Sequence, residues 1–283
     1  MPPDTLILIA ASNEADRLGQ TIAALAVAFP GAPVWVADDG STDATAELAR
    51  GAGATVVRCG VVIGKSHGKG QAMTLAAETA LSNILDSAAE AALSNILDSA
   101  DGNARVRACA RVPGDLEDGL SDLSGSPEAA GPRAAGTPAV DPILVLCDGD
   151  LGASARALAP LVDAVERGEA DLAVAAFSTR AGGGFGLALT FARWAIRRRC
   201  GLFTRAPISG QRAMRASVLH DVLPFAPGYA MEMGMTIDAV RAGRRLLEID
   251  LPLSHRSSGR TLAGFAHRGR QLFDFLRVYW TRR

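Results

Sequence analysis

The sequence predicts an α/β protein built on an open, doubly wound and mostly parallel β-sheet with helices on both faces. Two observations support this fold class. Short, almost uninterrupted apolar runs bounded by turn residues are typical of buried parallel strands. Helical patterns alternate with these runs, as they do in repeated strand, helix, strand units. The five runs are TLILIAAS, PVWVADD, ATVVRC, PILVLCD and DLAVAAFS.

The first helix is expected in EADRLGQTIAALAVAFPG, between the first two strands. Leu18, Ile22, Leu25 and Phe29 share one helical face, and Pro30-Gly31 ends the helix. A second helix follows VADDGSTD, a third starts at GKGQAM, and RRLLEIDLPLS is a further strand-like segment late in the chain.

A long insertion interrupts this alternation. ALSNILDSA occurs at 80–88 and again at 92–100, which indicates a local duplication, since two copies do not make a repeat array. Residues 101–141 are rich in Gly, Pro, Ala and Ser and have too little apolar surface to order themselves. We therefore expect one domain over residues 1–283, with a low-complexity, partly flexible insertion at about 86–139 and a basic amphipathic helix at about 261–283.

The composition is that of an ordinary globular protein, with 48% hydrophobic and 21% charged residues. The 29 basic and 30 acidic residues nearly cancel, so we expect no nucleic-acid partner. The apolar run Leu6–Ala11 is too short for a signal-peptide core or a membrane span. The four cysteines have no paired spacing, and we expect a cytoplasmic location.

Acidic residues follow two of the predicted strands. Asp38 and Asp39 are adjacent at a strand end, where their repulsion requires a compensating donor such as a base N–H, a ribose hydroxyl or a cation. Asp148 and Asp150 flank a glycine after ILVLC and offer the hard oxygen ligands that suit Mg²⁺ or Mn²⁺. For this second pair alone, a turn or a helix cap explains the pattern equally well. Ligands of open α/β sheets bind outside the carboxyl ends of strands, where both pairs are expected.

Six motifs in chain order resemble family-2 glycosyltransferases of the GT-A fold. They are AASNEAD, VADDGSTDATAELA, GKGQAM, LCDGDLG, SGQRAMRASVL and MEMGMTIDAVRAGRRLLEIDLPLSHRSSGR. The sequence is similar to bacterial polyprenyl-phosphate sugar transferases and to glucosyl-3-phosphoglycerate synthase-like enzymes of this family. It departs from the family's usual P-x-Y-N-E start, with Ala11-Ser12-Asn13-Glu14 instead, and the compact members have no counterpart of 86–139.

The resemblance implies metal-dependent transfer of a sugar from a UDP- or GDP-sugar donor to an unidentified acceptor, either polyprenyl phosphate or a small hydroxyl or phosphorylated molecule. It assigns donor binding to Ser12, Glu14, Asp38, Asp39, Gly68, Lys69, Gly70 and Asp148. It assigns Mg²⁺ or Mn²⁺ to Asp148, Asp150 and His255. A solvated Lys69 and a purely structural His255 are the alternative interpretations.

The resemblance also assigns catalytic roles to Glu232 and Arg212. Glu232 either orients or deprotonates an acceptor hydroxyl, or is only a favourable charge in a first helical turn. Arg212 is a candidate phosphate contact, because a guanidinium binds phosphate bidentately. Since a phosphate acceptor needs no strong base, dependence on Glu232 would indicate a hydroxyl acceptor, and dependence on Arg212 alone a phosphate.

Two other functions stay open, a sugar nucleotidyltransferase and a non-catalytic nucleotide-sugar-binding protein. IAASNEADRL lacks the G-x-G-x-R loop of the first, and intact Asp148 and Asp150 argue against the second. The basic amphipathic helix at about 261–283 either lies on the anionic inner face of a membrane or packs on the domain with its arginines in water. The sequence does not indicate the oligomeric state.

Overall fold

A computed structural model describes residues 5–59, 67–98, 141–177, 186–254 and 262–282. The chain divides into two compact units, residues 1–80 with 141–283, and residues 81–140. The first unit contains the whole sheet and every residue of the candidate site that the structure describes. In the second unit the structure describes a helical segment that ends at residue 98. Most of the expected insertion, and His255, lie outside the described residues.

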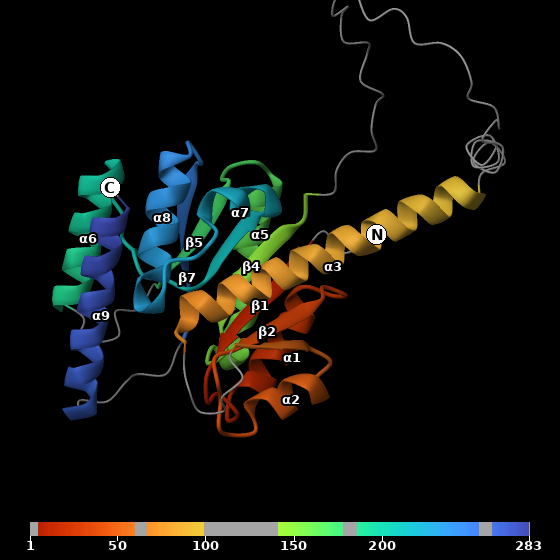
Figure 1. The fold of residues 1–283 in the computed structure, drawn as a ribbon, viewed down its shortest axis with the longest axis horizontal. Helices are drawn as coiled ribbons and strands as arrows, with labels where there is room; N and C mark the ends of the chain where they lie inside the picture. The colour runs from red at the N-terminus through yellow and green to blue at the C-terminus, as the bar shows by residue number, and fades with distance from the viewer. Residues whose placement is uncertain (1–4, 60–66, 99–140, 178–185, 255–261, 283) are drawn as a thin grey trace, which may run out of the picture. The chain divides into compact units, whose positions relative to one another are not determined.

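The first unit is built on a seven-stranded sheet in the order β3-β2-β1-β4-β6-β5-β7 (Figure 1). All pairs are parallel except those made by β6, so the predicted α/β class with an open, mostly parallel sheet is confirmed. The strands are β1 (Thr5–Ala11), β2 (Val34–Asp38), β3 (Thr55–Arg58), β4 (Ile143–Asp148), β5 (Leu172–Phe177), β6 (Arg212–Arg215) and β7 (Leu246–Leu251).

The helices follow the strands in the expected alternation. They are α1 (Leu18–Ala28), α2 (Thr45–Gly51), α3 (Lys69–Asp98), α5 (Ala159–Glu166), α6 (Gly186–Cys200), α7 (Ala216–Val222), α8 (Met231–Arg241) and α9 (Leu262–Thr281), with short 3₁₀ helices η1 (Gly152–Leu158) and η2 (Gly228–Ala230). The four residues predicted to share one face of the first helical segment are all buried. The predicted helix start at GKGQAM is the start of α3.

Strand β6 is absent from the sequence prediction, because four residues with an arginine at each end do not form an apolar run. It lies between β4 and β5 and is antiparallel to both, with Leu146 opposite Arg212. Since β6 runs against β4, its first residue lies at the sheet edge where β4 ends. The SGQR segment is thereby brought beside Asp148.

The main hydrophobic core covers one face of the sheet. Ile7 and Ile9 of β1 and Val145 of β4 pack there with the apolar sides of α1 and α5. Alternation along the strands directs Leu144 and Leu146 to the opposite face, where they are also fully buried. Burial on both faces explains why these strands read as continuous apolar runs.

A second core joins three helices, α6, α8 and α9. Ile196 of α6, Met233 and Ile237 of α8, and Phe275 and Val278 of α9 are buried together. Helices α6 and α9 lie side by side (Figure 1). This core supports the start of α8, where Glu232 lies.

Gly70 allows the start of α3 to pack directly against backbone. A Cβ added at Gly70 would lie 1.9 Å from the carbonyl oxygen of Ala226 and 3.2 Å from the Cα of Pro227. Because these neighbours are backbone atoms, a side chain would force the helix away from them. Lys69, the adjacent residue, would move with it.

We expect Gly70→Ala to lower the free energy of unfolding by roughly 1 to 3 kcal/mol, the usual cost of overpacking. Gly19→Ala is a matched control, since Gly19 is likewise the second residue of a helix and has no neighbour within 4 Å of an added Cβ. That control should be neutral or slightly stabilising, because alanine favours helices over glycine. Urea unfolding of the three proteins measures the difference, and equal stability of the two variants would contradict the packing argument.

Candidate functional site

The candidate site lies at the carboxyl ends of the parallel strands. Ala10 of β1 is paired with Asp148 of β4, and Ala11 is paired with Asp38 of β2. Both groups of acids therefore lie at the same end of the sheet, where the parallel strands finish. The starts of α3 and α8 bring Lys69 and Glu232 to this edge. Residues far apart in the sequence therefore form one polar cluster where ligands of open α/β sheets bind.

Lys69 is the centre of the cluster. Its Nζ lies 2.6 Å from Asp148 Oδ1 and 2.6 Å from Glu232 Oε1. The side chain of Glu232 is 6% exposed, whereas that of Asp148 is 35% exposed. Burial disfavours the ammonium, but the charges of Asp148 and Glu232 outweigh this effect and hold the pKa of Lys69 well above its usual range. Lys69 is thus a permanent cation, and the alternative of a solvated surface lysine is wrong.

Two neighbours restrict how Asp148 is placed. Gln211 Nε2 donates a hydrogen bond to Asp148 Oδ2 at 2.7 Å. A Cβ added at Gly210 would lie 2.7 Å from the same oxygen and 2.6 Å from Lys69 Nζ, so only glycine leaves room for the pair. Sequence reasoning did not identify Gln211, although it directly precedes Arg212 in the SGQRAM motif. Its role depends on the antiparallel placement of β6.

The segment after Asp148 is held against α1. Thr21, fully buried, donates from its hydroxyl to the carbonyl of Gly149 at 2.7 Å and accepts from the N–H of Gly152 at 2.8 Å. Arg17 donates to the carbonyl of Asp150 at 3.2 Å. These bonds join the backbone of the Asp148-Gly149-Asp150 turn to the start of α1. The two carboxylates follow the end of β4.

The donors that compensate Asp38 come from the protein. Asp38 is fully buried and accepts hydrogen bonds from Arg58 Nε at 2.7 Å and from the N–H of Ser41 at 2.9 Å. Burial opposes its ionisation, but the bonds from Ser41 and Arg58 outweigh burial and lower the pKa of Asp38. These bonds give Asp38 a structural role, and its expected contact with the sugar donor stays a prediction. Arg58, at the end of ATVVRC, was missed because its pairing with β2 is not visible in the sequence.

Asp39 organises the approach to α3. It accepts hydrogen bonds from the backbone N–H of His67 at 2.7 Å and of Gly68 at 3.0 Å, and it is 7% exposed. The repulsion that predicted an external donor for Asp39 is thus relieved internally as well. These bonds fix the two residues before Lys69.

The loops after β1 and β2 are joined by hydrogen bonds. The N–H of Asn13 donates to Ser41 Oγ at 3.0 Å, and the N–H of Glu14 donates to Thr45 Oγ1 at 2.9 Å. Ser12 donates to the carbonyl of Asp39 at 3.4 Å. The loop that carries Ser12 and Glu14 is therefore fixed beside Asp39, at the same sheet edge as Lys69.

Arg212 lies beneath the cluster. It is 1% exposed, and it donates from Nε to the carbonyl of Ser209 at 2.8 Å and from Nη1 to Thr236 Oγ1 at 3.0 Å. Burial lowers the pKa of Arg212 to about 10, against the raising effect of Glu232. The guanidinium of Arg212 is buried in this structure, with Nη2 making no hydrogen bond, and its contact with a phosphate stays a prediction.

The expected metal ligands are described only in part. Asp148 and Asp150 lie together at the end of β4, whereas His255 falls outside the described residues. Within the described ranges no group of three or more His, Cys, Asp and Glu side chains could hold a metal ion. Two carboxylates still fit Mg²⁺ or Mn²⁺, because such ions commonly keep waters and take one or two carboxylates together with substrate phosphates.

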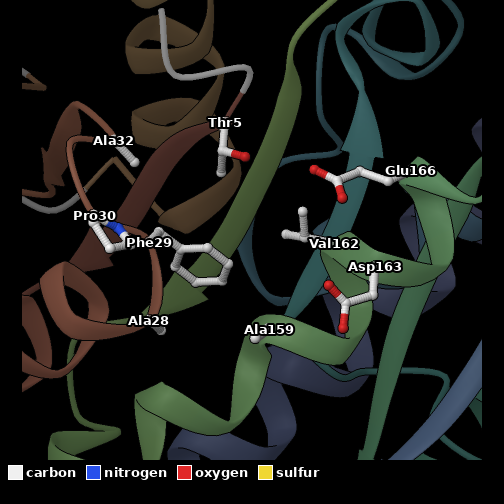
Figure 2. Close-up of a pocket in the computed structure, with 9 residues that line it drawn as sticks. All are labelled: Thr5, Ala28, Phe29, Pro30, Ala32, Ala159, Val162, Asp163 and Glu166. Carbon is white, nitrogen blue, oxygen red and sulfur yellow. The ribbon is translucent and has the colours of Figure 1, made fainter. Parts of the chain in front are cut away.

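A hollow elsewhere on the first unit does not belong to this cluster. Figure 2 shows the Phe29 ring beside Val162 and the carboxylates of Asp163 and Glu166. The hollow, with a volume of about 260 Å³, is lined by Thr5, Ala28, Phe29, Pro30, Ala32, Ala159, Val162, Asp163 and Glu166. Thr5, which lines the hollow, is the first residue of β1, whereas the candidate site follows the last residue of β1. The hollow and the candidate site therefore lie at opposite ends of the strands.

A family model and several solved structures are similar to this chain. Residues 6–85 match the family described as glycosyl transferase family 2. No curated protein matches the chain by sequence.

Solved structures of glucosyl-3-phosphoglycerate synthase from Mycobacterium tuberculosis are similar in fold. A complex with Mn²⁺, UDP and glucosyl-3-phosphoglycerate has a TM-score of 0.62 and 20% identity, covering 98% of this chain and 79% of that one. A complex with Mg²⁺ and UDP has a TM-score of 0.61 and 23% identity, covering 97% and 78%. The same enzyme has been solved with Mn²⁺, UDP-glucose and glycerol 3-phosphate. These matches confirm the GT-A-like fold.

We expect Lys69→Met to lower the free energy of unfolding by about 3 kcal/mol, because it leaves the buried charge of Glu232 without its cation. Adding Glu232→Gln should recover part of this loss, since the uncompensated charge is then removed. Urea unfolding of the two single variants and the double variant at neutral pH forms the cycle. Strictly additive losses would contradict the pairing of Lys69 with Glu232.

Proposed function

We propose, from the match of residues 6–85 to glycosyl transferase family 2 and the similarity in fold to solved glucosyl-3-phosphoglycerate synthases, that this chain transfers a sugar from a UDP-sugar to a hydroxyl group of a small acceptor. The observation that carries the proposal is the shared position of Lys69 between Asp148 and Glu232. One cation links the expected donor-side acid to the expected acceptor-side acid. The donor base is chosen because the similar solved structures hold UDP and UDP-glucose.

The donor side of the reaction needs positive charge where the nucleoside diphosphate leaves. Lys69 lies at the start of α3, where backbone N–H groups also favour a phosphate. Asp148 and Asp150 would hold Mg²⁺ or Mn²⁺, the ions present in the similar solved structures. When bound, such an ion neutralises charge on the departing diphosphate. Ser12, Glu14 and Asp39 would flank the nucleoside, since their loops meet beside this cluster.

The acceptor side needs a group that can take a proton. In the proposed reaction the acceptor oxygen bonds to the sugar C1, the bond from C1 to the diphosphate oxygen breaks, and the hydroxyl proton passes to Glu232. Glu232 places a carboxylate beside the cluster, 2.6 Å from Lys69 Nζ, and a positioned carboxylate can act as a general base. A hydroxyl acceptor follows, because a phosphate acceptor would not need this acid.

Arg212 would act as a positioning residue. Its Nη1 donates to Thr236 Oγ1, and Thr236 donates to the backbone carbonyl of Glu232 one helical turn earlier. This chain of hydrogen bonds runs from β6 to the first turn of α8. Arg212 would therefore fix the orientation of Glu232 without contacting the acceptor.

We expect UDP with Mn²⁺ to raise the melting temperature of the protein more than UDP or Mn²⁺ alone, since a ligand stabilises the state that binds it. Asp148→Asn and Asp150→Asn should each remove the metal-dependent part of this shift while preserving the fold. Asp163→Asn is the matched control, because Asp163 is exposed beside the separate hollow. An unchanged metal-dependent shift in both site variants would contradict the assignment, and a GDP preference would correct the donor.

We expect Glu232→Gln to lower kcat for sugar transfer to hydroxyl acceptors by roughly 10²- to 10⁴-fold, the usual contribution of a general base. The melting-temperature shift caused by UDP and Mn²⁺ should remain, because donor binding is assigned to other residues. Arg212→Lys should reduce kcat less than Glu232→Gln does, as a positioning residue would. Full activity of Glu232→Gln with loss of activity in Arg212→Lys would favour a phosphate acceptor such as polyprenyl phosphate. Binding without transfer to any acceptor would favour a non-catalytic protein.

A further inference from the structure

Helix α9 has an apolar stripe on the side away from its core contacts. Phe273, Leu276 and Trp280 are 66%, 38% and 57% exposed. With Arg277, also exposed, they occupy positions i, i+3, i+4 and i+7, which share one side of a helix. The core contacts of α9 are made instead by Phe275 and Val278 on the other side. The C-terminal part of the helix is thus apolar on two sides.

Aromatic rings extend this stripe onto α6. Tyr279 lies between Trp280 and Trp194, with ring centroids 5.6 Å and 5.0 Å apart, and Trp194 of α6 is 49% exposed. Arg197 of α6 lies over the ring of Phe203, at 4.3 Å, and Phe203 is 73% exposed. We call the exposed residues of these two neighbouring helices and the loop after α6 the α6–α9 face, which comprises Trp194, Arg197, Phe203, Phe273, Leu276, Arg277 and Trp280.

The exposed charges among the described side chains of α6 and α9 are arginines, and the acids beside the neighbouring loop, Glu248 and Asp250, are ion-paired with Arg205. Helix α6 contains four arginines and no acidic residue, and the exposed ones are Arg193, Arg197 and Arg198. The one acid of α9, Asp274, accepts a hydrogen bond from the N–H of Tyr229 and is half-buried. The whole chain has a formal net charge of −1, so this concentration of arginine is local.

We propose that the α6–α9 face binds the surface of an anionic phospholipid bilayer. Exposed tryptophan, phenylalanine and leucine would enter the headgroup region, and the arginines would contact lipid phosphates. No helix among the described residues is long and apolar enough to cross a membrane, so the contact would be peripheral. The inference does not rest on the proposed sugar transfer.

The charge also decides between a bilayer and a second copy of the chain. A two-fold symmetric dimer places the same patch of both copies face to face, so arginines of one copy would oppose arginines of the other. Like charges at such an interface are unfavourable. Anionic headgroups instead complement the arginines, and a flat bilayer suits a stripe spread over two neighbouring helices.

Flotation with lipid vesicles tests the proposal. The full-length protein should float with vesicles of equal parts phosphatidylglycerol and phosphatidylcholine, much less with phosphatidylcholine alone, and less at high salt because salt screens exposed charges. The double variant F273S/W280S should reduce binding by roughly tenfold, as expected for withdrawing two large apolar side chains from the interface. Val27→Ser is the apolar control, since Val27 is 74% exposed on α1.

A double arginine variant separates the electrostatic contribution to vesicle binding from the apolar one. Arg193→Gln with Arg277→Gln should weaken binding to anionic vesicles roughly 30-fold, given about 1 kcal/mol for each arginine near an anionic surface. Arg50→Gln, an exposed arginine of α2, should leave binding unchanged. Equal binding to both vesicle types, or no binding, would overturn the proposal. A dimer in light scattering that F273S/W280S dissociates would assign the face to a second copy instead.

Discussion

The repulsion between carboxylates gathered at one sheet edge is the constraint on which the site depends. Asp148 and Glu232 both reach this edge, and a single ammonium, that of Lys69, lies 2.6 Å from each. Without it, Glu232 would be a buried and uncompensated charge, which is among the most costly arrangements in a protein interior. The position of Lys69 therefore holds both acids at this end of the sheet.

Much of the surrounding structure holds Lys69 in that position. Asp39 fixes the backbone immediately before it, and Gly70 lets the helix start approach the backbone at Ala226. Gly210 leaves the space that its ammonium and Asp148 occupy. Gly68 and Gly70, which the resemblance assigns to donor binding, lie against the backbone of Gly228 and Ala226. The two uses are compatible, because a cation fixed in this way would also be placed for the diphosphate of the proposed donor.

Helix α9 connects the site with the outer surface of the molecule. Its buried side packs with α6 and α8, and Asp274 accepts a hydrogen bond from the N–H of Tyr229 in η2, which leads directly into the turn that carries Glu232. Its exposed side bears Phe273, Leu276 and Trp280. Amphipathicity alone did not distinguish a packed helix from a surface-binding one, because this helix has apolar residues on both its buried side and its exposed side.

The sequence by itself determined the α/β class, five of the seven strands as apolar runs and a sixth as a strand-like segment, and the strand-end positions of the acids. These features have local causes: apolar runs, helical periodicity and turn residues act over a few neighbours. Only the tertiary structure decided which acids meet a cation and which are buried in the fold. Lys69 is separated from Asp148 by 79 residues and from Glu232 by 163, and β6 is too short and polar to be recognised before its partners are known. Asp38 and Asp148 look alike in the sequence, yet Arg58 buries one within the fold while the other stays partly exposed at the site, because pairing across strands is decided by the sheet and not by the residues beside each acid.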